Sequence, residues 1–236
     1  MDFKNIYITG DKHAAFNELM DNAIRYRFSN NDLIIILGDV GINYFDSNRD
    51  ESAKRILSDI PGTFLCIHGN HELRPTSPKI AKKYKKIEWF GDTAYVENKY
   101  PKLIMAEDGS RYKINDHEFL IIGGAYSVDK EYRLKHHLNW YEDEQLNDTE
   151  KTAIKQKIKD HGNKEDIILA HTCPFKAIPT ETFLPGIKQE TVDNSTEIFL
   201  QKIVDTTDFN DFYCGHYHIE KNIGPVHFLY ERVIKL

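Results

Sequence analysis

Cysteine is scarce in this sequence, which has three cysteines among 236 residues. Cys66, Cys173 and Cys214 show no Cys-x-x-Cys spacing, which argues against a disulfide framework and against a structural zinc site built from thiolates. Each of them lies near the end of an apolar run. We therefore expect reduced, mostly buried thiols, as is usual for a cytoplasmic protein.

Long apolar runs are also absent. No stretch approaches the roughly 20 apolar residues of a membrane-spanning helix, so no membrane contact is expected. The opening residues, MDFKNIYITGD, lack the basic segment, apolar stretch and cleavage site of a signal peptide. Both absences predict a cytoplasmic location.

Basic residues are in the minority, with 31 Lys and Arg against 37 Asp and Glu and a formal net charge of -6. This charge repels a polyphosphate backbone, so nucleic acid is open as a partner only through a local patch or bound cations and is not favoured. Hydrophobic residues make up 40% of the chain, which is typical of a globular protein. The length suits one α/β core, so we predict a single domain spanning residues 1–236.

Short apolar runs alternate with amphipathic stretches in the first third of the chain, a pattern typical of βαβ units. Predicted strands cover residues 6–9, 33–37 and 64–67, and predicted helices cover residues 15–28 and 51–60. Residues 87–125 change to short β-rich pieces, including a strand at 120–124, which suggests a second, more antiparallel layer.

The second half adds two helices and one long connection. Residues 142–161 are charged almost all round and predict a surface helix ending at Gly162. Residues 174–193 contain three prolines and one glycine, which predicts a long loop that acts as a lid or specificity element. Asn194 followed by Glu197 predicts a capped helix that runs through Val204.

Polar side chains follow five of the apolar strands, at the point where each strand ends. The ends of adjacent strands in an α/β sheet converge on one crevice, so these side chains should form one cluster. All are oxygen or imidazole donors without a thiolate, which suits two divalent ions such as manganese, iron or zinc. The predicted ligands are Asp11, His13, Asp39, Asn70, His171, His216 and His218.

The spacing and chemistry of these residues suggest how they share the ions. The Asp-x-His spacing at Asp11 and His13 places two side chains on one side of an extended segment, and His216 and His218 repeat it. The charged carboxylate of Asp39 suits a bridging position between two ions. The neutral amide of Asn70 suits a ligand that binds through one atom.

Five motifs occur in a fixed order: Gly-Asp-x-His, Gly-Asp, Gly-Asn-His-Glu, a strand-terminal His171 and Gly-His-x-His. In this order they resemble the calcineurin-like metallophosphoesterase superfamily over nearly the whole chain. The Gly-Gly-Ala-Tyr-Ser-Val-Asp segment at 123–129 and the segment around Trp140 look most like its small bacterial and phage members. The resemblance implies an α/β fold, a four-layer αββα sandwich of two mixed sheets flanked by helices.

The resemblance also implies roles for individual residues. One metal would be held by Asp11, His13, Asp39 and His218, and the other by Asp39, Asn70, His171 and His216. His71 would be the acid that protonates the leaving group. Two departures stand out: Ala14 replaces a glycine common after the first His, and Ile42-Asn43 replace the Asp-Arg pair of the protein serine/threonine phosphatases.

The function implied is a metal-dependent phosphoesterase that hydrolyses phosphate esters of small molecules by attack of a water activated by two divalent ions, with manganese expected first. Monoester and diester substrates both stay open. Arg133 is the predicted substrate-binding residue, because a guanidinium matches phosphate bidentately, and Arg74 is a weaker candidate. The alternatives are a phosphodiesterase or nuclease and, less favoured, a non-catalytic metal-binding scaffold, since the sequence retains every ligand and the acid.

Overall fold

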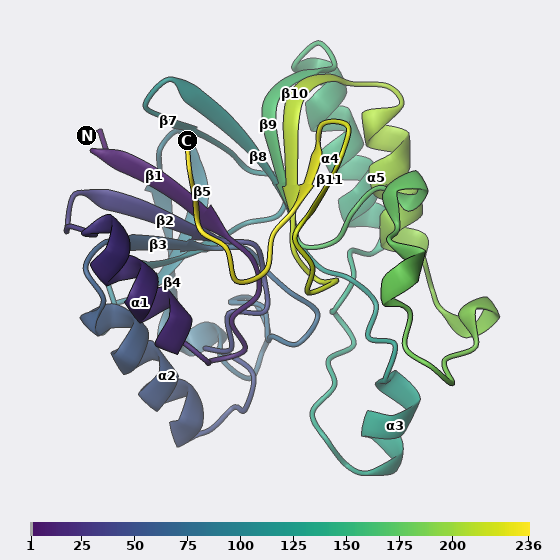
Figure 1. Cartoon of the computed structure of the whole chain (residues 1–236), viewed down its shortest axis with the longest axis horizontal. Helices are drawn as coiled ribbons and strands as arrows, with labels where there is room; N and C mark the ends of the chain where they lie inside the picture. Colours follow the sequence, from purple (N-terminus) through teal and green to yellow (C-terminus); the bar gives the residue numbers. More distant parts are fainter. Residues whose placement is uncertain (1) are drawn as a thin grey trace.

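Two mixed β-sheets lie face to face in the computed structural model of the chain, which describes residues 2–236 (Figure 1). The first sheet has seven strands in the order β13-β1-β2-β3-β6-β5-β4. Strands β1, β2, β3 and β6 run parallel, and the remaining three run antiparallel to their neighbours. The strands are β1 (Asn5–Thr9), β2 (Asp32–Ile36), β3 (Thr63–Cys66), β4 (Tyr84–Trp89), β5 (Asp92–Glu97), β6 (Leu103–Ala106) and β13 (Ile234–Lys235).

The second sheet has six strands in the order β11-β12-β10-β9-β8-β7. Its four inner strands run parallel, and β7 and β11 pair antiparallel at the two edges. The strands are β7 (Arg111–Ile114), β8 (His117–Ile122), β9 (Lys164–Ala170), β10 (Asp208–Cys214), β11 (Lys221–Ile223) and β12 (Val226–Phe228).

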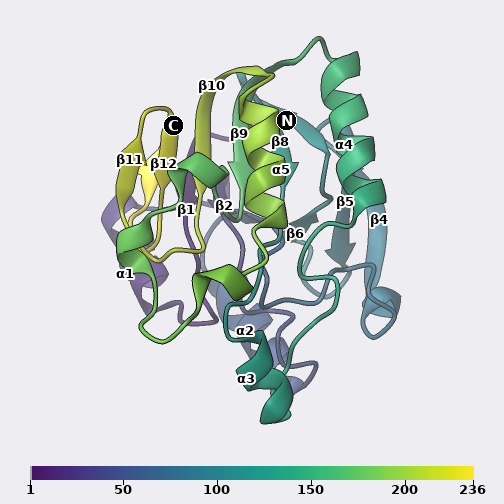
Figure 2. The same ribbon diagram turned by 90° about the vertical axis from the view of Figure 1, so that its right-hand side faces the viewer.

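Helices cover the outer faces of both sheets. Helices α1 and α2 pack on the first sheet, whereas α4 and α5 pack on the second, where Figure 2 shows them in front of β8, β9 and β10. Helix α3 projects away from both sheets at the bottom of Figure 1. The α-helices are α1 (Asn17–Tyr26), α2 (Asn48–Asp59), α3 (Lys130–Lys135), α4 (Asp148–Asp160) and α5 (Ser195–Val204). Four 3-10 helices are η1 (Ala81–Lys83), η2 (Phe175–Ala177), η3 (Thr180–Thr182) and η4 (Gln189–Thr191).

Strand β2 shows why the apolar runs are continuous. Its side chains Leu33 and Ile35 face the second sheet, whereas Ile34 and Ile36 face α1 and α2, and all four are fully buried. A strand buried on both faces needs apolar residues at every position rather than at alternate ones. The layers are therefore helix, sheet, sheet and helix, which confirms the predicted αββα architecture.

The structure corrects the prediction that residues 87–125 form a second layer. Strands β4, β5 and β6 extend the first sheet, and only β7 and β8 begin the second one. Short β-rich pieces show that strands form, but periodicity does not tell which sheet a strand joins.

One predicted helix start and one predicted helix cap were also wrong. Helix α4 begins at Asp148, six positions after the predicted start, because Asn147 and Glu150 form a capping box there. Helix α5 lacks the predicted side-chain cap from Asn194, and the N–H of Ser195 donates to Asp193 instead. Glu197 turns away to accept a hydrogen bond from Thr172.

Cys66, Cys173 and Cys214 are buried and unpaired. None of the helices within residues 2–236 has the length and apolar character that crossing a lipid bilayer requires.

Candidate functional site

All seven predicted ligands lie on segments that follow five parallel strands. In the first sheet, Asp11 and His13 follow β1, Asp39 follows β2, and Asn70 follows β3. In the second sheet, His171 follows β9, and His216 and His218 follow β10. Residues that follow strands of both sheets lie close together here, as expected for the carboxyl ends of parallel strands. The structure therefore brings residues from both ends of the chain into one cluster.

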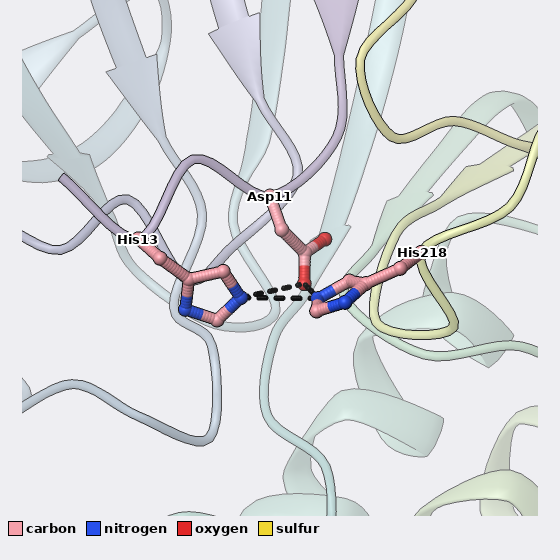
Figure 3. Close-up of side chains that lie close together, drawn as sticks. All are labelled: Asp11, His13 and His218. Atoms are coloured by element: carbon pink, nitrogen blue, oxygen red, sulfur yellow. Dashed lines mark hydrogen bonds and ion pairs between the residues drawn. The ribbon is translucent and has the colours of Figure 1, made fainter. Parts of the chain in front are cut away.

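One group of donors consists of Asp11, His13 and His218 (Figure 3). The Nε2 atoms of His13 and His218 lie 3.0 Å apart. The Oδ2 atom of Asp11 lies 3.2 Å from Nε2 of His218 and 3.8 Å from Nε2 of His13. The three donor atoms thus point at one small volume.

A second group surrounds His171, which is fully buried. Its Nε2 lies 2.8 Å from Oδ1 of Asn70 and 3.6 Å from Oδ2 of Asp39. The ring of His216 packs beside that of His171, with 5.1 Å between ring centroids. Oδ2 of Asp39 also lies 3.9 Å from Nε2 of His13, so Asp39 stands between the two groups.

Four of these separations, between 2.8 and 3.6 Å, fit metal coordination, whereas the two from His13 to the aspartates are slightly longer at 3.8 and 3.9 Å. An ion bound about 2.0–2.2 Å from each ligand atom places neighbouring ligand atoms roughly 2.8–3.6 Å apart in octahedral or tetrahedral geometry. The donors in each group are carboxylate or amide oxygens and imidazole nitrogens, the set that divalent transition metals accept. The donor set therefore suits divalent ions.

Asp11 and Asp39 use their two carboxylate oxygens for different tasks. Oδ1 of Asp11 accepts the backbone N–H of His216 at 2.8 Å, and Oδ1 of Asp39 accepts the backbone N–H of His71 at 2.8 Å. In both residues Oδ2 is the atom that faces the imidazoles. Each carboxylate thus fixes a neighbouring loop with one oxygen and offers the other as a ligand.

His171 is oriented from behind by the backbone. Its Nδ1 lies 2.8 Å from the carbonyl oxygen of Leu37, which can accept a hydrogen bond only from a protonated Nδ1. This contact favours the tautomer that leaves a lone pair on Nε2, the atom that faces Asp39 and Asn70.

The charges of the site follow from burial and close contacts. Burial, aided by the neighbouring His171, lowers the pKa of His216 to about 3, so this ring stays neutral. Burial would raise the pKa of Asp11, but His171, His218 and His13 outweigh it and hold the pKa well below its usual range. The hydrogen bond to Asp11 raises the pKa of His218 in the protein without bound ions.

The backbone turns sharply at the ligands, which overturns the expectation of extended Asp-x-His and His-x-His segments. His13, Asp39, His216 and His218 have φ angles of 46°, 45°, 67° and 51°. Left-handed backbone at residues other than glycine costs of order 1–3 kcal/mol each and clusters at functional sites. Ala14, where the resemblance has glycine, is also left-handed, with φ of 62°.

The His71 ring lies at the edge of the cluster and lines a cavity beside it. Its centroid lies 5.9 Å from that of His13 and 6.1 Å from that of Tyr44. Burial lowers the pKa of His71, while the charge of Asp39 opposes that shift. His71 belongs to neither donor group.

The two arginines lie in different places. The Arg133 guanidinium donates to Asp129 at 2.8 Å and to the Tyr44 hydroxyl at 2.6 Å. It is not among the described residues that line the cavity, so its contact with substrate stays a prediction. Arg74 forms a buried ion pair with Asp108 and does not line that cavity either.

Sequence reasoning missed two residues that support the ligands. The Ser127 hydroxyl accepts a hydrogen bond from the Asn70 amide at 2.9 Å, which turns Oδ1 of Asn70 toward His171. Fully buried Glu72 accepts the N–H of Gly41 at 2.7 Å and so ties the Asp39 loop to the Asn70 loop. The signal for Glu72 was its place in the Gly-Asn-His-Glu motif.

We expect Glu72→Ala to lower the free energy of unfolding by about 1–3 kcal/mol, because the Gly41 N–H loses its acceptor. Metal affinity should fall about 10–100-fold. Burial, with Asp39 nearby, raises the pKa of Glu72 to about 8, so its side chain is mostly neutral at pH 7. Glu72→Gln, which is also neutral, should therefore retain most of the stability and most of the metal affinity. Chemical denaturation and metal titration measure the two variants, and equal losses in both would count against this positioning role.

The cavity beside the donors has a volume of about 270 Å³. Its lining includes Asp39, Asn70, His13, His216 and His218 on the side of the cluster, together with His71. Residues between 178 and 192, from the loop predicted to be a lid, form another part of the lining. A small molecule in this cavity would contact both the donors and that loop.

Comparison with known proteins bears on the family and the fold of this chain. The model of the calcineurin-like phosphoesterase family matches residues 4–220. No curated protein matches the chain in sequence. One solved structure aligns with a TM-score of 0.56 at 8% identity, covering 96% of this chain and 89% of that one, which shows the fold alone.

Two further solved structures are similar in outline. Phosphopantetheinyl hydrolase from Mycobacterium tuberculosis is 11% identical, with a TM-score of 0.48, and covers 96% of this chain and 88% of its own. The protein TT1561 of Thermus thermophilus is 13% identical, with a TM-score of 0.49, and covers 99% of this chain and 98% of its own.

Proposed function

Because the chain belongs to the calcineurin-like phosphoesterase family, we propose that it hydrolyses phosphate esters of small molecules with the help of two divalent ions, manganese foremost. The observation that carries the proposal is the convergence of Oδ2 of Asp11 and of Asp39 on the imidazoles of His13, His171 and His218. Iron and zinc accept the same donors.

The residues divide into two ligand sets that share Asp39. Asp11, His13 and His218 with Asp39 would hold one ion, and Asn70, His171 and His216 with Asp39 would hold the other. When bound, the ions supply Lewis acidity that lowers the pKa of a water and neutralises charge on the phosphoryl oxygens. The chain itself orients the ligands, through Leu37 and Ser127, and places His71 at the edge of the cavity.

His71 is proposed to protonate the leaving group. Its backbone N–H is fixed by Asp39 and its ring borders the cavity, so a leaving oxygen held there lies on the same side as the imidazole. Its lowered pKa makes the proton easier to give up, since burial disfavours the charged ring. The cavity of about 270 Å³ favours a small substrate over nucleic acid.

We also propose a cytoplasmic location. The three cysteines are buried and unpaired, which suits a reducing compartment.

Metal reconstitution tests the proposed function. Protein stripped with a chelator should bind two manganese ions per chain, and saturation at 100 times the dissociation constant should stabilise the fold by about 2.7 kcal/mol per site. Hydrolysis of p-nitrophenyl phosphate or its bis ester should appear only after reloading. Two bound ions without turnover of any phosphate ester would favour the non-catalytic scaffold instead.

A further inference from the structure

We propose that residues 178–192 form a binding site for an apolar or aromatic substituent, and that the substrate is a singly charged phosphodiester carrying such a group. The inference rests on the proposed function and deepens it by naming the substrate class.

The cavity lining lacks basic side chains. Among the described residues that line it there is no lysine and no arginine. Besides Asp39, the lining carries two more carboxyl groups, those of Asp129 and Glu197. The guanidinium of Arg133 lies outside the lining and is paired with Asp129, a lining residue, at 2.8 Å.

This charge distribution favours a monoanion. Two divalent ions and the carboxylates of Asp11 and Asp39 would together carry a net charge of +2. One hydroxide and one phosphodiester would balance this charge. A dianionic monoester would leave one negative charge in excess, and a third charged oxygen would find no ammonium or guanidinium to receive it. In a diester that oxygen instead carries an organic substituent.

The lining offers a place for that substituent. The lining includes six apolar side chains, those of Val128, Ile178, Phe183, Leu184, Ile187 and Val192. Phe183 and Leu184 remain 38% and 58% exposed, so apolar surface at this position is left uncovered by the protein itself. Burying it against an aromatic or branched group stabilises the complex by roughly 25 cal/mol per Å² of apolar area.

The size of the cavity limits the substituent. A volume of about 270 Å³ lies just below the range of about 300–1,000 Å³ that is common for small-molecule sites. The cavity therefore suits a phosphoryl group with one ring or one branched chain rather than a polymer.

The reaction is a simple hydrolysis. The oxygen of water bonds to phosphorus, the bond from phosphorus to the leaving oxygen breaks, and that oxygen takes a proton from His71. One proton of the water restores His71 and the other passes to solvent, so the products are a dianionic monoester and an alcohol. The monoester has gained the charge that the cavity does not accommodate, so it should be released rather than cleaved again.

Three esters with the same leaving group test the inference on the metal-loaded protein. We expect kcat/KM for p-nitrophenyl phenyl phosphate to exceed that for p-nitrophenyl methyl phosphate about tenfold or more. It should exceed that for p-nitrophenyl phosphate by a similar factor. Bis(p-nitrophenyl) phosphate should release one equivalent of nitrophenolate per molecule.

A binding measurement separates recognition from turnover. Methyl(phenyl)phosphinate and dimethylphosphinate are monoanions without a cleavable ester bond, and calorimetry gives their dissociation constants on the metal-loaded protein. The phenyl compound should bind about tenfold more tightly. Phe183→Ala should reduce this ratio to less than threefold.

Phe175→Ala is the matched control. Phe175 lies in the same loop and is 45% exposed, but it is not part of the cavity lining. This variant should keep the full ratio of phenyl to methyl binding.

The outcomes separate the two levels of the proposal. Equal rates and affinities for phenyl and methyl compounds, or faster turnover of the monoester, would overturn the inference while the phosphoesterase function stands. An unchanged ratio in Phe183→Ala would overturn the assignment of the site to residues 178–192. No turnover of any of the three esters with two ions bound would instead defeat the proposed function.

Discussion

Asp39→Asn is expected to remove both metal ions and to lower kcat/KM for a phosphate ester by about 10³-fold or more. Oδ1 of Asp39 holds the N–H of His71, so an asparagine that keeps this bond turns its amide N–H₂ toward His13 and His171. A neutral donor then stands where two ligand sets need a shared, charged acceptor.

Metal analysis after dialysis and steady-state kinetics measure this effect. Asp129→Asn is the matched control, because Asp129 lines the same cavity but belongs to neither donor group. That variant should retain two ions per chain. If Asp39→Asn also retained two ions at wild-type affinity, Asp39 would not be the residue that joins the two groups.

The second large effect is expected for His71→Ala, which should slow turnover about 10²- to 10⁴-fold without loss of metal. The contact that His71 makes with Asp39 is through its backbone N–H, and alanine keeps that bond. Only the imidazole that borders the cavity is lost.

The leaving group distinguishes proton donation from a structural effect. Phenolate is a stronger base than p-nitrophenolate and needs the proton more, so the loss should be larger for phenyl than for p-nitrophenyl esters. His227→Ala serves as a control, since His227 contacts Asn222 and Asp211 away from the cavity. A loss independent of the leaving group, or a loss of metal equal to that in Asp39→Asn, would contradict this role.

The first sheet illustrates what local pattern predicts well. The apolar runs at 6–9, 33–37 and 64–67 correspond to β1, β2 and β3, because strands buried on both faces leave a continuous signal in the sequence. The helices over 15–28 and 51–60 are present as α1 and α2, with ends shifted by up to three residues. The predicted side-chain cap of α5 is absent. Glu197 instead accepts a hydrogen bond from Thr172, which is distant in sequence.

The site shows the limit of the same reasoning. The seven ligand candidates could be recognised in the sequence as polar residues after strands. The turns at these residues could not be predicted, because four of them adopt left-handed backbone held by contacts between loops. The ion pair of Arg133 with Asp129, the link from Glu72 to Gly41 and the apolar lining from residues 178–192 all depend on contacts with other segments or loops.

By itself the sequence determined the type and order of the donors, and through the five motifs the family and the layered α/β fold, because these depend on residue chemistry and short-range periodicity. Only the tertiary structure decided which donors meet and what faces them. His13 and His218 are separated by 205 positions, yet their Nε2 atoms lie 3.0 Å apart because both follow strands that end at the same edge. That distance is set by the packing of two sheets, and no local pattern contains it.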